Sequence, residues 1–431
     1  MLKRLLALIL GVISLQSMAQ TETIKVVSYN LLFYKSGSTP CNHNRTAAQR
    51  DSDLQTIVSY LAPDVMVVQE LGSSPVNPLV MLQDIFNVNG ISHYDRAGSS
   101  NNSSSSIVNM LFYNSDKLEL VSQDFINLDI NQAPLVRVID FYRLYVKDQG
   151  LGIPGVDTVF FTIGVAHLKA GNSASDGDQR ARATEAVMKY VAENVPDDNV
   201  LFGGDLNIYG ANQTAFQNLV NSSSYPTANF QDPINQMGSW NNNSNYANYH
   251  TQSTHSSSSG CFSGGGMDDR FDMILASPAI MNNSDGLNYV SYQAVGQDGS
   301  SYNSNLNTSS NFSVNGTVAS ALFNFSDHLP VEIELEASVS GIGLDPLNAG
   351  ENYWSVRNPV KSSLSLDFKG SFSKLPLDIR VSNINGQPIG FWQCSGSNTL
   401  DIDVMDWPKG IYLVTVSNRD GFFETRKVVK L

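Results

Sequence analysis

Polar and ionisable residues stand at the ends of six short apolar segments of the sequence. They are Asn30, Gln69-Glu70, His167, Asp205 with Asn207, Asp272, and Asp327-His328. A buried carboxylate without a partner is costly, so several of them brought together require a cation. Oxygen ligands select a hard cation, which here would be Mg²⁺, with Mn²⁺ or Ca²⁺ as alternatives. These residue types therefore predict a divalent-metal site at which two histidines add acid-base chemistry.

Each of these residues, taken alone, also has an ordinary structural explanation. Glu70 could cap a turn, Asp205 could tighten a turn formed by two glycines, and His167 could be a hydrogen-bonded core histidine. In α/β folds, however, ligand sites lie at the ends of strands. The chemistry therefore depends on whether the fold brings these strand ends to one place.

Short apolar runs bounded by polar turns predict the strands that would carry these residues. The runs cover residues 24–29, 65–68, 109–113, 136–145, 159–166, 200–202, 271–275 and 330–335. Two intervening segments, 45–61 and 178–193, have apolar residues at helical spacing. This alternation of strands and helices predicts an α/β fold. The stretch 210–320, crowded with Asn, Ser and Gly, is expected to form long surface loops.

The order and local sequences of the motifs resemble the endonuclease/exonuclease/phosphatase superfamily, which has the deoxyribonuclease I-like fold. The matching segments are Ser28-Tyr29-Asn30, Val68-Gln69-Glu70, Ala166-His167-Leu168, Gly203-Gly204-Asp205-Leu206-Asn207, Asp269-Arg270-Phe271-Asp272 and Ser326-Asp327-His328-Leu329-Pro330-Val331. The resemblance covers nearly all of residues 24–336. It implies a four-layer α/β sandwich, with helices outside two packed mixed sheets, and a site at one sheet edge. It also implies a metal-dependent hydrolase of phosphate esters.

The resemblance further implies a role for each site residue. The implied metal ligands are Asn30, Glu70, Asp205 and Asp327, and the implied catalytic residues are His167, Asp205, Asn207, Asp272, Asp327 and His328. His328 would take the proton from the attacking water, and Asp272 would orient its ring through the other nitrogen. Asn207 and His167 would bind the phosphate, and His167 could also protonate the leaving group.

One feature departs from the deoxyribonuclease I pattern. Those enzymes place a carboxylate on the strand before the 111–113 segment, where it pairs with the counterpart of His167. No Asp or Glu lies between Asp95 and Asp116 in this sequence, and the polar run 99–106 stands there instead. The acid role of His167 is therefore not a strict copy of that pattern.

Arg137, within the predicted strand 136–145, is a candidate for binding an anionic substrate. Arg96, Lys169 and Arg270 could assist it. The alternative for each of these residues is a surface ion pair.

The first 19 residues predict a signal peptide. Lys3 and Arg4 precede an apolar run, and Ser17-Met18-Ala19 offers small residues for cleavage before Gln20. The run of residues 5–15 is too short to cross about 30 Å of hydrocarbon, and no other stretch is long and apolar enough. We therefore expect an exported protein without a transmembrane segment.

The composition changes near residue 338, which predicts a catalytic domain over 20–337, a linker over 338–356 and a C-terminal domain over 357–431. Five short alternating runs in the last part predict a small all-β sandwich. Asn358-Pro359, Asn385-Gly386 and Lys409-Gly410-Ile411-Tyr412, with the terminal Lys427-Val428-Val429-Lys430, resemble the C-terminal sorting domain of the type IX secretion system. The resemblance implies passage through the periplasm, recognition by the type IX machinery, and release or attachment at the cell surface.

Three cysteines are too few for a disulfide-scaffold fold. Cys41 and Cys261 lie in predicted loops next to motif strands, where they could form a disulfide or remain free, and Cys394 would stay unpaired.

Charge bears on the choice of substrate. Residues 20–337 hold 14 basic and 31 acidic side chains, a net charge of −17, which repels a polyanion unless a local basic track exists. The leading hypothesis is a secreted nuclease acting on DNA or RNA. The second is a phosphodiesterase or phosphatase for a small or lipid phosphate ester, such as a sphingomyelinase. The third, a non-catalytic surface binding protein, predicts missing catalytic residues, whereas all of them are present.

Overall fold

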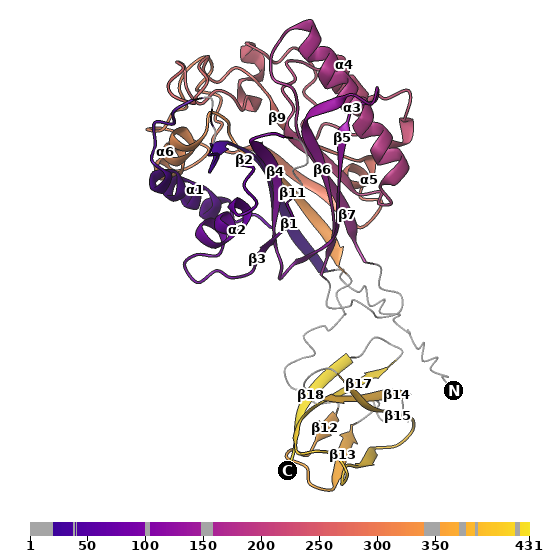
Figure 1. Cartoon of the computed structure of the whole chain (residues 1–431). Coiled ribbons are helices and arrows are strands. Elements are labelled where there is room, and N and C mark those ends of the chain that lie inside the picture. Colours follow the sequence, from indigo (N-terminus) through magenta and orange to yellow (C-terminus); the bar gives the residue numbers. More distant parts are fainter. Residues whose placement is uncertain are drawn as a thin grey trace, which may run out of the picture. The chain divides into compact units, whose positions relative to one another are not determined.

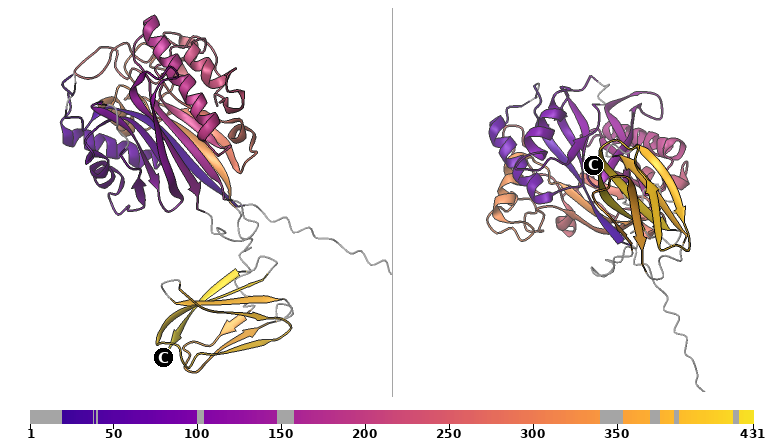
Figure 2. Two further views of the ribbon diagram at one scale, coloured as in Figure 1. Left: turned by 45° about the vertical axis from the view of Figure 1, so that its right-hand side comes forward. Right: turned by 90° about the horizontal axis from the view of Figure 1, so that it is seen from below.

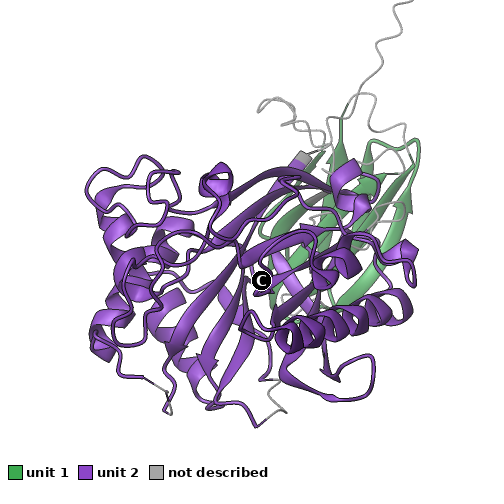
Figure 3. Ribbon diagram, turned by 90° about the horizontal axis from the view of Figure 1, so that it is seen from above, with its two compact units in different colours: residues 1–20, 340–431 green, residues 21–339 purple. Residues whose placement is uncertain are grey.

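The computed structural model describes residues 20–37, 39, 41–99, 104–147, 158–339, 354–369, 376–383, 387–418 and 423–431. The chain divides into two compact units, one of residues 21–339 and one of residues 340–431 with residues 1–20 (Figure 3). The predicted signal peptide and residues 340–353 of the predicted linker lie outside the described residues.

One sheet of the larger unit has six strands in the order β10-β11-β1-β2-β4-β3 (Figure 1). They are β1 (Gln20–Tyr34), β2 (Val65–Gly72), β3 (Tyr94–Arg96), β4 (Ile107–Asn114), β10 (Leu287–Ala294) and β11 (Val331–Val339). The pair β1 and β2 is parallel and the pair β2 and β4 is antiparallel, so the sheet is mixed. The strands next to Asn30, Glu70 and His328 are therefore neighbours in the middle of this sheet.

The second sheet has five strands in the order β5-β6-β7-β8-β9. They are β5 (Leu118–Leu128), β6 (Pro134–Val146), β7 (Phe160–His167), β8 (Val200–Asp205) and β9 (Asp272–Ala276). Only β7 and β8 are parallel. Their register places His167 opposite Asp205, and Asp205 opposite Asp272. Three predicted site residues thus lie side by side at one end of this sheet.

Helices cover the outer faces of both sheets (Figures 1 and 2). They are α1 (Ala47–Leu61), α2 (Asn77–Met81), α3 (Ala174–Asn194), α4 (Thr214–Val220), α5 (Pro278–Asn282) and α6 (Gly316–Phe325). One apolar core joins the two sheets to α1 and α6, and it includes Leu54, Phe325 and Ile163. A second core joins the other face of the five-stranded sheet to α3 and α4, and it includes Val187 and Phe216. The predicted four-layer α/β sandwich is confirmed.

Both predicted helices begin at side-chain caps. Thr46 accepts a hydrogen bond from the amide of Gln49 and caps α1, while Ser173 does the same with Asp176 at α3. Each cap satisfies amide groups that would otherwise lack partners at the helix start.

The expectation that residues 210–320 form only long loops is wrong. Besides the predicted β9, this stretch contains α4, α5, β10 and α6. Helix α6 is capped by Asn315 and buries Val318, Leu322 and Phe325. These elements are short and separated by polar turns, which dilutes their periodicity in the sequence.

The smaller unit consists of two antiparallel sheets. β12 (Trp354–Val356), β13 (Ser363–Phe368) and β16 (Thr399–Asp403) form one, and β14 (Leu377–Asn383), β15 (Pro388–Cys394), β17 (Gly410–Asn418) and β18 (Phe423–Lys430) form the other. Trp354, Leu366, Ile379 and Val414 contribute to one shared core. This confirms the all-β C-terminal domain, although the predicted turn at Asn385-Gly386 lies outside the described residues. Among the residues that the structure describes, no helix has the length and apolar character needed to span a membrane.

Candidate active site

The side chains of Asn30, Glu70 and Asp205 meet between the two sheets. Asn30 Nδ2 donates to Glu70 Oε1 at 3.2 Å and to Asp205 Oδ2 at 3.0 Å. All three side chains are buried. Glu70 and Asp205, which are far apart in the sequence, thus accept hydrogen bonds from the same amide group.

Strained backbone holds the Asn30 and Glu70 pair in place. Leu32, Phe33 and Glu70 have φ angles of 46°, 54° and 61°, in the left-handed region that non-glycine residues rarely adopt. This conformation lets Leu32 N donate to Asn30 Oδ1 at 3.0 Å, and Phe33 N to Glu70 Oε2 at 3.0 Å. Backbone strain of this kind concentrates at functional sites, where surrounding contacts maintain it.

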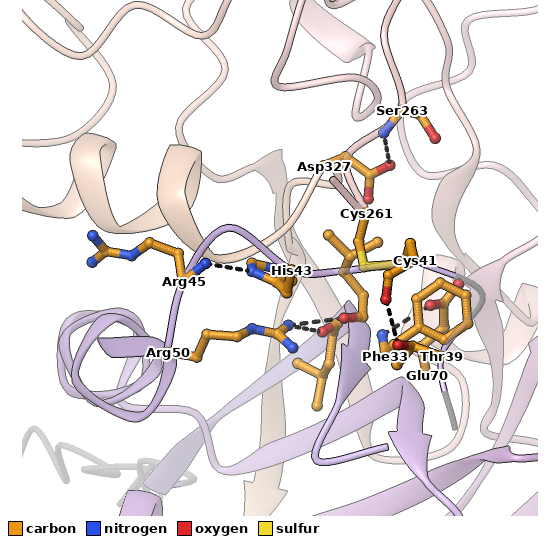
Figure 4. The surroundings of a disulfide bond; sticks show 12 residues. Phe33, Thr39, Cys41, His43, Arg45, Arg50, Glu70, Cys261, Ser263 and Asp327 are labelled. Carbon is orange, nitrogen blue, oxygen red and sulfur yellow. Dashed lines mark hydrogen bonds between the residues drawn. A yellow bond between two sulfur atoms is a disulfide. The ribbon is translucent and has the colours of Figure 1, made fainter. Parts of the chain in front are cut away.

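Arg50 supplies some of those contacts from α1. Its guanidinium (Arg50 in Figure 4) donates to the carbonyl oxygens of Leu31 at 2.6 Å and Leu32 at 2.9 Å. Its charge lies over the ring of Phe325. Arg50 is buried, so these bonds are shielded from water. Nothing in the sequence around Arg50 distinguishes it from a surface arginine, which is why sequence reasoning missed it.

His328 is held at both ring nitrogens. Its Nδ1 lies 2.7 Å from Asp272 Oδ2, and its Nε2 lies 2.6 Å from the side-chain Nε2 of Gln252. The same Nε2 is 3.8 Å from Asp205 Oδ2 and 3.5 Å from Asn30 Nδ2. His328 therefore faces the carboxylate pair with Nε2, and Asp272 fixes the ring from behind. Gln252, from the Asn- and Ser-rich stretch, was not predicted.

Asp327 turns toward the same loop as Gln252. Its Oδ2 accepts a hydrogen bond from Ser263 N at 2.9 Å, and its Oδ1 lies 4.0 Å from His328 Nε2. Two residues before Ser263, Cys261 forms a disulfide with Cys41 (Figure 4). This bond ties the loop at the site to the segment between β1 and α1, while Cys394 is free and buried.

His167 completes a cluster of ionisable groups. Its Nε2 lies 3.4 Å from Asp205 Oδ2 and 3.8 Å from Glu70 Oε1. Its Nδ1 is buried and has no hydrogen-bond partner within the described parts of the chain. The nearby strand β4 offers Asn109 instead of a carboxylate, and Asn109 Nδ2 donates to Asp140 at 3.1 Å rather than to His167. Among the described residues, Nδ1 of His167 thus has no acidic partner of the kind that the family pattern would supply.

Asn207 and Arg137 border the cluster from two sides. Asn207, with φ of 50°, donates from Nδ2 to Asp205 Oδ1 at 2.8 Å. Arg137 Nη1 donates to the carbonyl oxygens of His167 at 3.3 Å and Leu168 at 3.1 Å. Arg270 does not assist in binding an anionic substrate, because its buried guanidinium donates two hydrogen bonds of 2.8 Å to Asp232.

Burial dominates the electrostatics of the cluster. It raises the pKa of Asp205 to about 7, with further repulsion from Asp272 and Glu70, although His328 acts in the opposite direction. Burial also raises the pKa of Glu70, and burial together with Arg137 and His328 lowers the pKa of His167 well below its ordinary value. For His328 burial is outweighed by the charges of Asp272 and Asp205, which raise its pKa.

These groups fit a divalent cation. Glu70, His167 and Asp205 offer ligand atoms that all lie within 4.8 Å of one another, and all three residues are buried. Within the described ranges, Asp327 Oδ1 and Asp272 Oδ1 are buried and make no hydrogen bond. Such a concentration of buried acceptor atoms is stabilised by a cation, and mostly oxygen donors favour Mg²⁺ or a similar hard ion.

Comparison with known proteins identifies the class. The sequence matches the endonuclease/exonuclease/phosphatase family over residues 27–328 and the secretion system C-terminal sorting domain over residues 358–431. The chain belongs to the endonuclease/exonuclease/phosphatase family, whose members are phosphoesterases, and its C-terminal sorting domain indicates secretion or attachment to the cell surface. Both predicted resemblances are confirmed.

The chain is also similar to several solved structures. An endonuclease/exonuclease/phosphatase family protein from Bacteroides thetaiotaomicron is 16% identical and aligns over 74% of this chain and 96% of its own, with a TM-score of 0.43. One from Beutenbergia cavernae is 16% identical over 94% and 99% of the two chains, with a TM-score of 0.43. The human nocturnin catalytic domain with bound sulfate is 13% identical over 73% and 94%, with a TM-score of 0.45. The search of curated proteins finds no match.

Proposed function

We propose that this protein is a secreted, divalent-metal-dependent phosphodiesterase that cleaves DNA or RNA internally. The observation that carries the proposal is the convergence of five side chains, each within hydrogen-bonding or ion-pair distance of at least two of the others: Asn30, Glu70, His167, Asp205 and His328. Hydrolysis of a phosphate ester needs a base for water, a proton for the leaving oxygen and positive charge near the phosphoryl oxygens.

Glu70 and Asp205 would hold the metal ion, with Asn30 and His167 beside them. Asp327 would add a further carboxylate near the ion. Mg²⁺, when bound there, supplies positive charge against the phosphoryl oxygens and the leaving oxygen. The ligand set differs from the sequence prediction in that His167 joins the cluster and that Asn30 turns its amide nitrogen toward the two carboxylates.

His328 would accept the proton of the attacking water at Nε2. Its Nδ1 bonds Asp272, so Nε2 is the nitrogen that faces the carboxylate cluster. Asp272 keeps the ring in one orientation and stabilises the positive charge that forms on it. Asn207 and Arg137 would bind the phosphate, the first through its amide and the second through its guanidinium. His167, already beside Asp205, would donate to a phosphate or leaving oxygen.

A small or lipid phosphate ester is the second candidate substrate. The observation in its favour is the net charge of −17 over residues 20–337, which repels long polyanions at low ionic strength. Both candidates use the same site and the same chemistry.

The test is hydrolysis of a panel by the purified protein. The panel holds plasmid DNA, single-stranded DNA, RNA, bis(4-nitrophenyl) phosphate, 4-nitrophenyl phosphate and sphingomyelin, each with Mg²⁺ and with EDTA. We expect cutting of nucleic acid with Mg²⁺, none with EDTA, and loss of turnover by orders of magnitude in Glu70→Gln and His328→Ala. The matched control Glu334→Gln, a carboxylate on β11 facing solvent-exposed Ser291, keeps the activity. Activity on sphingomyelin but not on nucleic acid would reverse the ranking, and activity that persists in EDTA would place the chemistry elsewhere.

A further inference from the structure

A cavity of about 210 Å³ lies next to His167, between the start of β6 and helix α3. Residues that line it include Leu135, Arg137, His167, Lys169, Gln179 and Arg182. Pockets that hold a whole drug-sized ligand are usually about 300 Å³ or larger. This cavity therefore suits one group of a substrate whose reacting part sits at the neighbouring site.

Positive charge is concentrated in this cavity. Three of the 14 basic side chains of residues 20–337, namely Arg137, Lys169 and Arg182, line it. Only one carboxylate, that of Asp129, belongs to the lining. The cavity is thus locally cationic within a domain of net charge −17.

Two guanidinium groups in the lining keep unused donors. Arg137 bonds carbonyl oxygens through Nη1 only, and Arg182 bonds Asp129 Oδ2 through Nε at 2.7 Å. Across the described ranges of the chain, no hydrogen bond engages the remaining nitrogens of Arg137 or the two terminal nitrogens of Arg182. A guanidinium with free terminal donors is the group best suited to a phosphate, because its fork matches two oxygens at once.

Two of the three positive charges are also paired with an acid. Asp129 fixes Arg182, and Asp176 fixes Lys169 at 2.8 Å from the first turn of α3. The lining also includes the apolar side chains of Leu135, Ile139 and Ala183. The cavity therefore combines cationic groups held in fixed positions with an apolar side, and His167 forms part of its wall.

We propose that this cavity is a subsite for a second phosphate of the substrate, one that is not hydrolysed. This rests on the proposed phosphoesterase function of the adjacent site. The second phosphate comes either from the neighbouring nucleotide of a strand or from a bisphosphorylated small molecule, and both have the same chemistry in the cavity. The subsite makes the enzyme select substrates that carry two phosphates a short distance apart.

The experiment compares substrate pairs that differ only in the second phosphate. One pair is thymidine 5′-(4-nitrophenyl phosphate) with and without a 3′-phosphate, and the other is fructose 6-phosphate and fructose 1,6-bisphosphate. For the wild-type protein we expect kcat/KM to rise roughly ten- to hundredfold with the second phosphate in at least one pair, as a charge-assisted bond implies. In Arg182→Gln and in Lys169→Gln this ratio falls toward one, and Arg182→Lys recovers part of it.

The matched control is Arg143→Gln, which removes one positive charge from β6, the strand that also carries Arg137. Arg143 is paired with Asp197 through Nε and Nη2, as Arg182 is paired with Asp129 through Nε, but Arg143 is not among the residues that line the cavity. We expect this variant to keep the wild-type ratio. A preference in the thymidine pair identifies a nucleic-acid strand as the source of the second phosphate, and one in the fructose pair identifies a small molecule. An equal ratio in wild type and Arg182→Gln for both pairs overturns the subsite.

Failure of the proposed function gives a different result. If no pair is hydrolysed and Glu70→Gln behaves as wild type, then the phosphoesterase proposal is wrong. Whether the cavity holds a phosphate is then tested by binding measurements alone. Titration calorimetry with thymidine 3′,5′-bisphosphate in EDTA then shows at least tenfold weaker binding in Arg182→Gln if the cavity holds phosphate. Equal binding to wild type and to Arg182→Gln, or no binding to either, overturns the proposal of a phosphate subsite.

Discussion

The Nδ1 atom of His328 lies 2.7 Å from Oδ2 of Asp272, although the two residues are 56 positions apart in the sequence. Asp272 begins β9 in one sheet, whereas His328 lies shortly before β11 of the other, which begins at Val331. The contact therefore depends on how the two sheets pack. The hydrogen bond to Asp272 occupies Nδ1 of His328, so Nε2 faces Asp205 and Asn30.

Replacing Asp272 with Asn should slow hydrolysis roughly 10²- to 10⁴-fold through kcat, with little change in KM. The amide can hold the ring, but it cannot stabilise an imidazolium as a carboxylate does. Steady-state kinetics with bis(4-nitrophenyl) phosphate measures this. Asp268→Asn removes a carboxylate four residues away and should retain the wild-type rate. Equal kcat in Asp272→Asn and wild type would exclude His328 as the base.

The Gln252 side chain should contribute to kcat through its amide. Gln252 Nε2 lies 2.6 Å from His328 Nε2, so it restrains the nitrogen that would take the proton. We expect Gln252→Ala to lower kcat roughly tenfold, in line with the loss of one hydrogen bond to a charged group. Gln252→Met keeps the length of the side chain without the amide and serves as the control for packing. Wild-type kcat in Gln252→Met would show that the amide is dispensable.

Much of the fold could be predicted from the sequence, and so could the candidate site residues that lie at strand ends. Gly203-Gly204-Asp205 and Ala166-His167 are local patterns, and the fold places them in register because both follow buried strands. The helix from Ala47 to Leu61 shows its apolar spacing and its cap in a single stretch of sequence.

Gln252, Ser263 and Arg50 could not be predicted, for a common physical reason. Each one acts through a contact that depends on tertiary packing: Gln252 pairs its backbone with Asp269, and Ser263 reaches Asp327 across 64 positions. The stretch that holds the first two is polar throughout, so no periodicity marks them. Long-range contacts leave no signal in the types of neighbouring residues.

Reduction of the Cys41–Cys261 disulfide should lower both stability and activity. The bond closes a separation of 220 positions and ends two residues from Ser263, whose amide holds Asp327. We expect Cys41→Ser to lose about 2–4 kcal/mol of unfolding free energy. We also expect kcat to fall roughly tenfold, as for loss of one hydrogen bond to a carboxylate. Urea denaturation and steady-state kinetics measure the two effects.

Cys394→Ser is the control, since Cys394 lies in the other unit and forms no disulfide. Treatment of wild type with dithiothreitol should reproduce the Cys41→Ser result and leave Cys41→Ser itself unchanged. Full activity of reduced wild type would mean that the loop holds Asp327 without the bond.

Acid should destabilise the large unit partly through His43. Burial, aided by the nearby charge of Arg50, lowers the pKa of His43 from 6.5 to about 4, although the backbone of Phe325 acts in the opposite direction. Between these values the unfolded chain binds a proton that the folded chain excludes, so the stability from neutral His43 is present above about pH 6.5 and is lost as pH falls toward 4. Because His43 is partly exposed, we expect a loss on the order of 1 kcal/mol between pH 7 and 5. Urea denaturation of His43→Gln should show a correspondingly shallower fall in unfolding free energy, while His93→Gln follows wild type. The same slope in His43→Gln and wild type would assign the acid sensitivity to other groups.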